Sequence, residues 1–587
     1  MGTGPQRVAS FFMVMVMWVV LPGCGGGGDS PAPQSSSPPP GGSTATISDP
    51  FFVNQWHLKN EGQKIDRLGG QHLPGTPGED VNVESVWNRG LLGQGIRIHI
   101  VDDGLEEEHE DLAPNVLRGE GYNFLHRDNG CTAPCAPNNL GPRDPSPAPL
   151  SEHNHGTAVA GVAAASANNI GGRGAAPAAK LVGYNLNALE TPAQSEHEDI
   201  AMSHNIEKAD IHNNSRQLIA GSQHTGVGFI LPPLPGFYSG VEKGVRDGRS
   251  GRGTIYLFAA GNGGNSEVPL LIGSPLATDD SNYSGMSNNR HVMAICATDA
   301  RGKKSVYSEN GANLWVCAPS NVGGNVDLPA ITTTDRMGDR GLNYTGKLAA
   351  TGEDDYSNSN YTARFSGTSA ATPLAAGVTA LVLQANPNLG WRDVRLILAE
   401  TARKNDPSDS DWGDIGLNTT GDKYHHNHKY GFGVINADAA VQRAITWTNV
   451  GPQLTQSFPP ELKQVNAAIP DNNSAGVSDA ITVSSSGISS IEFIEITFSA
   501  DHEFDGELNV TLTHENTGIQ SQLATERRCR LSSSGPEVTC GGYKGWVFGS
   551  ARHLGEMADG IWTLRVSDRI RNDVGTFESW KLTFYGR

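Results

Sequence analysis

The sequence has no excess of basic residues. Of its 587 residues, 43 are Lys or Arg and 62 are Asp or Glu, which gives a net charge of -19. A protein that binds a phosphate backbone needs a basic face, so this balance argues against nucleic acid as a partner. It suits an exported protein in which some carboxylates bind cations.

Long apolar runs are scarce as well. The most apolar stretch, FFMVMVMWVV at 11–20, is far shorter than the roughly 20 residues that a membrane-spanning helix needs. It follows Arg7, and residues 1–23 are therefore predicted to be an export signal. No other stretch is long and apolar enough to span a bilayer, and no internal repeat is visible. We expect contact with a membrane only through a lipid anchor.

The predicted signal ends in LPGC, which resembles the lipobox of bacterial lipoproteins. The resemblance implies that Cys24 is acylated, and Gly25 after it implies sorting to the outer membrane of a bacterial cell envelope. An ordinary cleaved signal, and hence a secreted protein, is the alternative. Residues 24–48 are rich in Gly, Pro and Ser and are predicted to be a disordered tether.

Cysteine is also rare, with 7 residues in the chain. If Cys24 is lipidated, the other cysteines form three close pairs. An even set in an exported chain favours disulfides. Zinc binding is the weaker interpretation, because no histidine or further cysteine stands at zinc-ligand spacing beside any pair. The predicted pairs are Cys131 with Cys135, Cys296 with Cys317, and Cys529 with Cys540.

Two periodicities divide the rest of the chain. Over 49–447, apolar strands such as GIRIHIV (95–101) and TIYLFAA (254–260) alternate with alanine-rich helical stretches. This alternation predicts an α/β domain, with a parallel sheet covered by helices on both faces. Over 450–587, apolar residues alternate with polar ones between Gly-rich turns, which predicts an antiparallel β-sandwich.

Chemically useful side chains stand at predicted strand ends and helix starts. GIRIHIV is followed by DDG with Asp102, and TIYLFAA by GNGG with Asn262. His155 begins the helical HGTAVAG, and Ser369 begins the helical run after FSGT. Because ligands gather at the carboxyl ends of parallel strands, the four residues could meet in one crevice. Each motif alone fits a turn, a cap or a solvated group, whereas the four together are far more specific.

VDDG, HGTAVAG, AAGNGG and FSGTSAATPLAAG resemble the motif set of subtilisin-like serine proteases (peptidase family S8), and the double aspartate resembles the kexin and furin branch. GWVFGSARHLGEMADGIWTLRVSD resembles the P (Homo B) domain of that branch, a jelly-roll-like β-sandwich. The resemblance implies a serine-type endopeptidase that acts on proteins or peptides. It implies Ser369 as nucleophile, His155 as base and Asp102 as its orienting acid. Asn262 and the Ser369 backbone N–H would stabilise the oxyanion.

The primary specificity pocket departs from this family pattern. The family's NYDGYTNS reads NYSGMSNN here, so that Ser284 replaces an acid, and SWGPxDDG reads SRQLIAGS at 215–222. A lysine or arginine side chain of the substrate would then be buried unpaired, which predicts altered primary specificity. An acid from the insertion 265–280 is the alternative. For the neighbouring subsite, Asp103 and Glu152 match acidic positions of the family.

The resemblance also implies calcium as a cofactor. Asp49, Asp111 and Asn169 match the main calcium site of the family, and oxygen ligands are the type this ion prefers. Asp279 and Glu309 match a second site, whose third acid is lost in SRQLIAGS. For that second site, ordinary solvated carboxylates are the alternative interpretation.

Residues 25–48 are too few for a folded pro-domain, because chains below about 40 residues rarely fold unaided. We therefore expect either a separate folding chaperone or spontaneous folding assisted by calcium and the sandwich domain, and we expect a monomer. Two other functions compete. A catalytically silent surface lipoprotein would bind a partner through its sandwich. A lipase is disfavoured, since no GxSxG elbow with a later histidine is present.

Overall fold

The computed structural model describes residues 49–67, 70–71, 73–124, 143–147, 153–186, 197–216, 229–264, 279–323, 328–344, 355–527, 529 and 538–587. The predicted export signal and tether lie outside the described residues. So do Cys24, Cys131, Cys135 and Glu152. Residues 46–587 form a single unit, so both predicted domains belong to one body.

The predicted parallel sheet is present as seven strands in the order β4-β5-β3-β6-β7-β8-β9, and all of its pairings are parallel. Its strands are almost wholly buried because helices cover both faces, which explains their near-continuous apolar sequences. The strands are β3 (Arg97–Asp102), β4 (Tyr122–Asn123), β5 (Lys180–Asn185), β6 (Ile211–Asn214), β7 (Ile255–Ala259), β8 (Val292–Thr298) and β9 (Leu314–Pro319).

Successive residues of β7 belong to different hydrophobic cores, which shows that both faces of the sheet are covered by helices. Leu257 belongs to the core formed with α2 (His155–Ala164) and α7 (Thr368–Ala385). Tyr256 and Phe258 belong to the core formed with α4 (Glu198–Ser203) and α5 (Phe237–Gly251). The prediction of helices on both faces is confirmed. Among the described residues of the α/β domain, the other helices are α1 (Glu84–Asn88), α8 (Trp391–Thr401), α9 (Ala437–Ile445) and the 3-10 turns η1 (Phe52–Asn54) and η3 (Ser281–Tyr283).

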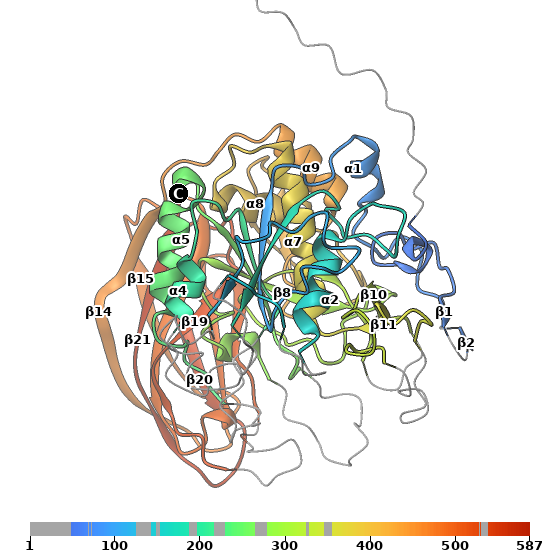
Figure 1. The fold of residues 1–587 in the computed structure, drawn as a ribbon. Coiled ribbons are helices and arrows are strands. Elements are labelled where there is room, and N and C mark those ends of the chain that lie inside the picture. Colours follow the sequence, from blue (N-terminus) through green and yellow to red (C-terminus); the bar gives the residue numbers. More distant parts are fainter. Residues whose placement is uncertain are drawn as a thin grey trace, which may run out of the picture. The chain divides into compact units, whose positions relative to one another are not determined.

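The helix α7 is the central buried helix of the α/β domain and contacts both α2 and the sheet (Figure 1). Small residues allow the close approach: a Cβ at Gly377 would lie 2.7 Å from Ala175 Cβ. The expectation that no stretch beyond the export signal is long and apolar enough to span a bilayer is wrong for α7, which meets both criteria by length and composition. However, 83% of its apolar window is buried inside the protein. It is therefore a core helix of the folded domain.

Three small antiparallel hairpins complete the α/β domain. They are β1 (Asp66–Arg67) with β2 (Gly70–Gln71), β10 (Ile331–Thr334) with β11 (Tyr361–Phe365), and β12 (Gly413–Leu417) with β13 (Lys423–His426). The second hairpin matters for the site, because β11 leads directly into the turn before α7.

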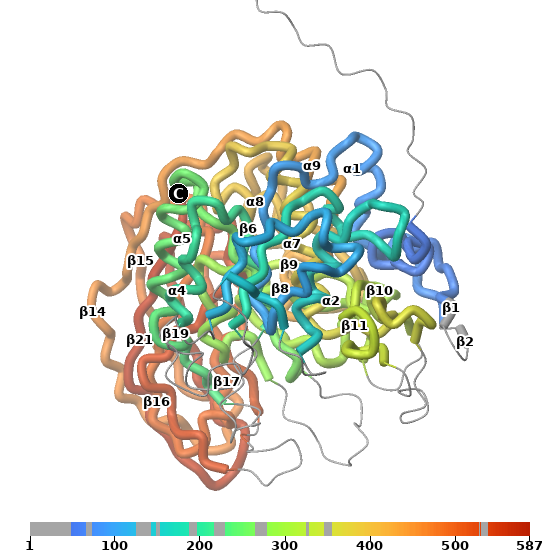
Figure 2. The backbone as a smooth tube through the Cα atoms, in the orientation of Figure 1, coloured from blue at the N-terminus to red at the C-terminus, as the bar shows by residue number. Residues whose placement is uncertain are grey.

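The C-terminal part forms two four-stranded antiparallel sheets, as the period-two pattern predicts (orange to red in Figure 2). Alternate residues such as Phe498, Leu512 and Trp562 are completely buried between them. One sheet contains β14 (Leu454–Ile469), β21 (Gly575–Gly586), β16 (Ile491–Asp501) and β19 (Tyr543–Ser550). The other contains β15 (Val477–Val483), β20 (Gly560–Asp568), β17 (Leu508–His514) and β18 (Ile519–Ala524), and η4 (Asp505–Glu507) precedes β17.

Two of the three predicted disulfides are confirmed. Cys296–Cys317 joins the neighbouring strands β8 and β9, and Cys529–Cys540 closes a loop of the sandwich domain. The third predicted pair lies outside the described residues.

Candidate active site

The four residues singled out in the sequence stand at the carboxyl edge of the parallel sheet or at helix starts that face it. Asp102 is the last residue of β3, and Asn262 lies three residues after β7. His155 is the first residue of α2, and Ser369 is the second of α7. This is where the topology of an open α/β sheet places ligand-binding groups.

Asp102 and His155 form a direct hydrogen bond. His155 Nδ1 donates to Asp102 Oδ1 over 2.8 Å, and the carboxylate is only 2% exposed. With the proton held on Nδ1, the Nε2 atom of the imidazole is left as the basic nitrogen. The ring also packs edge-on against Phe365, the last residue of β11, with 5.4 Å between ring centroids.

The environment of His155 favours its charged form. Burial lowers the pKa of the imidazole, but the charge and hydrogen bond of Asp102, and then the charge of Asp103, outweigh burial and raise that pKa to about 9. About a third of the side chain, 34%, remains exposed to solvent. A base in this position is therefore strengthened by two neighbouring carboxylates.

Ser369 rests against Ser215, which directly follows β6. Ser369 Oγ donates to the Ser215 carbonyl over 3.2 Å, while Ser215 Oγ donates to the Ser369 carbonyl over 2.9 Å. The contacts of the described residues include no hydrogen bond between Ser369 Oγ and His155. Such bonds are often loose before substrate binds. Phe365, four residues before Ser369, contacts the His155 ring, so the turn that leads into α7 lies beside this ring.

Asn262 faces the turn that leads into α7. Its Oδ1 accepts hydrogen bonds from both Thr368 N and Thr368 Oγ1, each over 2.9 Å, which identifies Nδ2 as the outward donor. Gly367 has a φ of 80° and would bring a Cβ within 3.4 Å of that Nδ2. The contact itself would be tolerated, so it is the positive φ that calls for glycine at this position.

Asp103 occupies the N-terminus of α2. Its Oδ2 accepts from His155 N over 3.0 Å, and its Oδ1 accepts from Gly156 N over 2.7 Å. Burial, and then the charge of Asp102, raise the pKa of this carboxyl above its ordinary value. The side chain that the sequence predicts to bind substrate thus fixes the start of the helix carrying His155.

Ser284 lies directly after η3 and is 3% exposed. Its carbonyl accepts from Asn288 N over 2.8 Å, and its hydroxyl has no hydrogen-bond partner among the described residues. Of SRQLIAGS, only Ser215 and Arg216 are described. Arg216 was not foreseen as a site residue: it is buried and forms a two-pronged ion pair with the completely buried Glu198.

The residues predicted for the main calcium site lie close together. Asp49 Oδ1 accepts from Asn169 N over 2.8 Å, and its Oδ2 accepts from Arg173 Nε over 2.6 Å. Asp111 is fully buried, and its Oδ1 has no hydrogen-bond partner among the described residues. Burial raises the pKa of Asp111 to about 8, and the charge of Asp49 adds to the rise. An unpartnered buried carboxylate oxygen fits a hard cation, whereas Arg173 competes with such an ion for Asp49.

The acids of the second predicted site flank the loop that carries Asn262. Glu309 Oε1 accepts from Gly263 N over 2.9 Å, and a Cβ on Gly263 would lie 2.7 Å from Asp279 Cβ. Both acids therefore lie beside Gly263.

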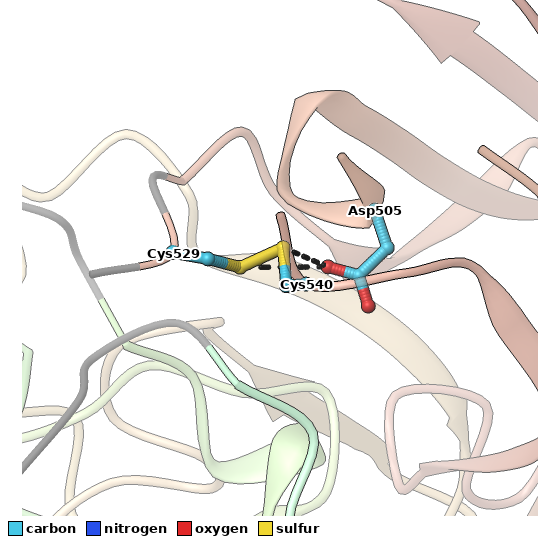
Figure 3. Close-up of side chains that lie close together, drawn as sticks. All are labelled: Asp505, Cys529 and Cys540. Atoms are coloured by element: carbon cyan, nitrogen blue, oxygen red, sulfur yellow. Dashed lines mark hydrogen bonds between the residues drawn. A yellow bond between two sulfur atoms is a disulfide. The ribbon is translucent and has the colours of Figure 1, made fainter. Parts of the chain in front are cut away.

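Two further clusters of metal-type side chains lie in the sandwich domain, and the sequence did not reveal them. In one, Asp505 Oδ1 lies 3.0 Å from Cys540 Sγ (Figure 3). Both sulfurs there belong to a disulfide, so they are not thiolate ligands. In the other, His502 Nδ1 accepts from Phe504 N, which leaves the proton on the Nε2 atom that faces Asp568 at 3.8 Å. That nitrogen is a donor rather than a metal ligand.

Comparison with known proteins agrees with this geometry. The model of the subtilase family matches residues 93–433, and that of the proprotein convertase P-domain matches residues 491–584. The chain is 32% identical to kexin of Saccharomyces cerevisiae over 92% of its own length and 57% of that protein. It is 31% identical to proprotein convertase subtilisin/kexin type 7 of Homo sapiens, over 92% of the chain and 60% of the relative. It thus spans about three fifths of these relatives.

Two solved structures share the fold. A serine protease of Aeromonas sobria superposes with a TM-score of 0.73 at 25% identity, over 92% of this chain and 96% of that one. The complex of that protease with a chaperone gives a TM-score of 0.73 at 24% identity, over 92% and 95%.

Proposed function

Since the chain belongs to the subtilase family of serine proteases and carries a convertase-type P domain, we propose that it is a serine endopeptidase that cleaves proteins or peptides through an acyl-enzyme. The observation that carries the proposal is the 2.8 Å hydrogen bond between a buried Asp102 and His155, at the sheet edge where α7 presents Ser369. The P domain is taken here as residues 450–587.

In the proposed reaction, Ser369 Oγ attacks the peptide carbonyl carbon while His155 Nε2 takes the hydroxyl proton. Asp102 stabilises the resulting imidazolium and keeps it oriented. Asn262 Nδ2 and the Ser369 backbone N–H donate to the oxyanion, in an environment where fixed donors need no rearrangement. His155 then gives its proton to the leaving amine, and water hydrolyses the ester by the reverse sequence.

The proposed enzyme has altered primary specificity. Ser284 offers a hydroxyl where the family has an acid, and Arg216 is committed to Glu198 rather than available to a substrate. A peptide library whose cleavage sites are read by mass spectrometry tests this. We expect no strict preference for Arg or Lys at the scissile position, and such a preference would contradict the altered pocket. Asp103, which is 7% exposed, remains the proposed acid next to that pocket, together with Glu152.

We further propose that calcium stabilises the fold at Asp49, Asp111 and Asn169, with a weaker second position at Asp279 and Glu309. A bound calcium ion would neutralise buried carboxylates. Asp111 carries this proposal, because its buried oxygen lacks a donor and its pKa is raised to about 8.

For the protein's setting, we propose export, with acylation of Cys24 in a bacterial outer membrane or release as a secreted protease. The relatives named as kexin and proprotein convertase support export in general terms. The Aeromonas protease was crystallised with a chaperone, which supports a separate folding chaperone as a partner of this monomer.

Labelling with a small fluorophosphonate tests the proposed function against a silent lipoprotein. The wild type should be labelled and Ser369→Ala should not. Ser366→Ala, which removes a neighbouring hydroxyl in the same turn, is the matched control and should label like the wild type. A folded wild type that resists the reagent would support the silent protein and overturn the proposal.

A further inference from the structure

The short helix η3 connects the Asn262 loop to the P domain. On the side of the α/β domain, Asp279 N donates to Gly263 O over 3.1 Å, next to Asn262. Asp280 then caps η3 by accepting from Asn282 N over 2.9 Å. The segment from Asp279 to Ser284 therefore runs directly from the loop of the proposed oxyanion donor to the proposed specificity residue.

The other side of η3 is held by β19 of the P domain. Asn282 is completely buried, and its Oδ1 accepts from Gly549 N over 3.0 Å. The Asn282 carbonyl accepts from Trp546 Nε1 over 3.1 Å. Asn288, four residues beyond Ser284, donates to Val547 O over 2.6 Å. The strand β19 thus makes two hydrogen bonds to Asn282 of η3 and one to Asn288 beyond it.

Arg527 makes a second contact between the P domain and η3. Its guanidinium lies 3.8 Å from the ring centroid of Tyr283, which is 1% exposed. Within the P domain, Arg527 donates to Asp505 over 3.1 Å and to Tyr543 Oη over 3.0 Å. The planar cation is therefore fixed on one side and stacked on the other, an arrangement that a lysine cannot reproduce.

A 3-10 helix of three residues has little stability of its own. Its position is determined by what it packs against. These neighbours are the P domain and, in the α/β domain, Leu231 and Asn310, which form backbone hydrogen bonds with Tyr283 and Ser281. A displacement of η3 would be passed to Gly263 through the Asp279 hydrogen bond, and to Ser284 through the chain itself.

We propose that Arg527, Trp546 and the backbone of β19 hold η3 in place and, through it, act as positioning groups for the Asn262 loop and for Ser284. This inference rests on the proposed function, because it uses the roles given there to Asn262 and Ser284. None of the positioning groups touches the reacting atoms.

The test compares Arg527→Met with Arg392→Met. Arg392 of α8 also forms a buried link to the P domain, with two hydrogen bonds of 2.6 Å to Glu492 of β16, but it does not touch η3. Both variants remove one guanidinium from the contact between the domains. At a temperature where circular dichroism shows both folded, we expect Arg527→Met to lower kcat about tenfold and to change the cleavage-site profile. Arg392→Met should keep kcat within about twofold and leave the profile unchanged.

Trp546→Phe is a milder second variant, which removes the hydrogen bond to Asn282 together with part of the ring that packs against the sandwich core. We expect a fall of about threefold in kcat, so the proposal stays testable if Arg527→Met does not fold. Equal kinetics and cleavage profiles for Trp546→Phe, Arg527→Met and Arg392→Met would overturn it.

Hydrogen exchange separates a failure of this inference from a failure of the proposed function. If the wild type does not react with fluorophosphonate, the protease proposal fails. The claim that Arg527 holds η3 and the Asn262 loop in place can still be tested by hydrogen exchange. The amides of Asp279–Ser284 and Gly261–Gly264 should then exchange faster in Arg527→Met than in Arg392→Met. Identical exchange in the two variants would refute the positioning role.

Discussion

Two roles are proposed for Asp103, substrate binding and an effect on His155, and a single substitution can distinguish between them. If Asp103 acts mainly as a substrate-binding acid, Asp103→Asn should change KM only for peptides with a basic residue in the neighbouring subsite. If it acts through His155, as its hydrogen bond to His155 N suggests, the substitution should move the pH dependence for every peptide. We expect the second result.

The direction of the expected shift in pH dependence follows from the charge on His155. His155 must be neutral to accept the proton of Ser369, so activity is lost as pH falls through the pKa of His155. Burial lowers that pKa, while Asp102 and then Asp103 raise it to about 9. Removing the Asp103 charge should therefore move the acid limb of kcat/KM to lower pH. A nearby carboxylate shifts a pKa by about 1–3 units, and solvent at the exposed edge of the ring reduces this to about one.

One unit corresponds to about a tenfold change in the neutral fraction of the base at low pH. The comparison belongs above pH 7, because burial and the charge of Asp102 raise the pKa of Asp103 to about 7, and the carboxyl is charged only above that pH. Relative to its own plateau, Asp103→Asn should therefore be about five times more active than the wild type near pH 8. The assay is kcat/KM between pH 5 and 10 for two peptides that differ only in having Lys or Ala next to the scissile residue. Glu84→Gln, which changes a half-buried acid of α1 that pairs with Lys59, is the control. An unmoved acid limb, or a shift seen only with the Lys peptide, would refute the reasoning.

Three further outcomes are expected. Chelation of calcium should lower the melting temperature of the wild type in scanning calorimetry. The decrease should be smaller for Asp111→Asn, because this variant lacks the unpartnered buried carboxylate. An equal decrease in both proteins would argue against this site. Replacing Cys529 and Cys540 by serine should lower the free energy of unfolding in urea by about 3 kcal/mol for a loop of this length, and an unchanged midpoint would contradict it. Glu198→Gln should lower the free energy of unfolding by about 3–5 kcal/mol, because it leaves the Arg216 guanidinium buried without its counter-charge. The double change Glu198→Leu with Arg216→Met should lower this free energy by less. Equal losses in the two variants would contradict the ion-pair explanation.

The sequence predicts the elements that carry the site because periodicity and motif coincide there. GIRIHIV becomes β3 and ends at Asp102, and the helical run after FSGT becomes α7 with Ser369 in its first turn. Local pattern decides such features, since a buried strand needs apolar residues and a helix start needs a permissive turn. The two-sheet sandwich follows in the same way from alternation in β16, β17 and β20.

What the sequence does not reveal depends on contacts between distant segments. Arg173 lies 124 residues from Asp49 yet donates to it, so a predicted calcium ligand also has an arginine partner. The Ser369 hydroxyl rests on Ser215, 154 residues away, rather than on His155. No local pattern encodes these choices, because each is decided by which groups the tertiary fold brings within about 3 Å.

Glycines of the motifs explain why the proposed catalytic pair can form at all. A Cβ on Gly156, the residue after His155, would lie 2.1 Å from the Gly104 carbonyl and 2.9 Å from Asp102 Cβ. The start of α2 therefore touches the backbone at the end of β3, and only this close approach lets Asp103 accept from Gly156 N while Asp102 accepts from the His155 ring. The glycine after the histidine is thus a steric requirement of the carboxylate–imidazole hydrogen bond. Asp103, the second aspartate of DDG, joins the end of β3 to the start of α2 through its two hydrogen bonds. It therefore lies close enough to His155 for its charge to raise the pKa of the imidazole.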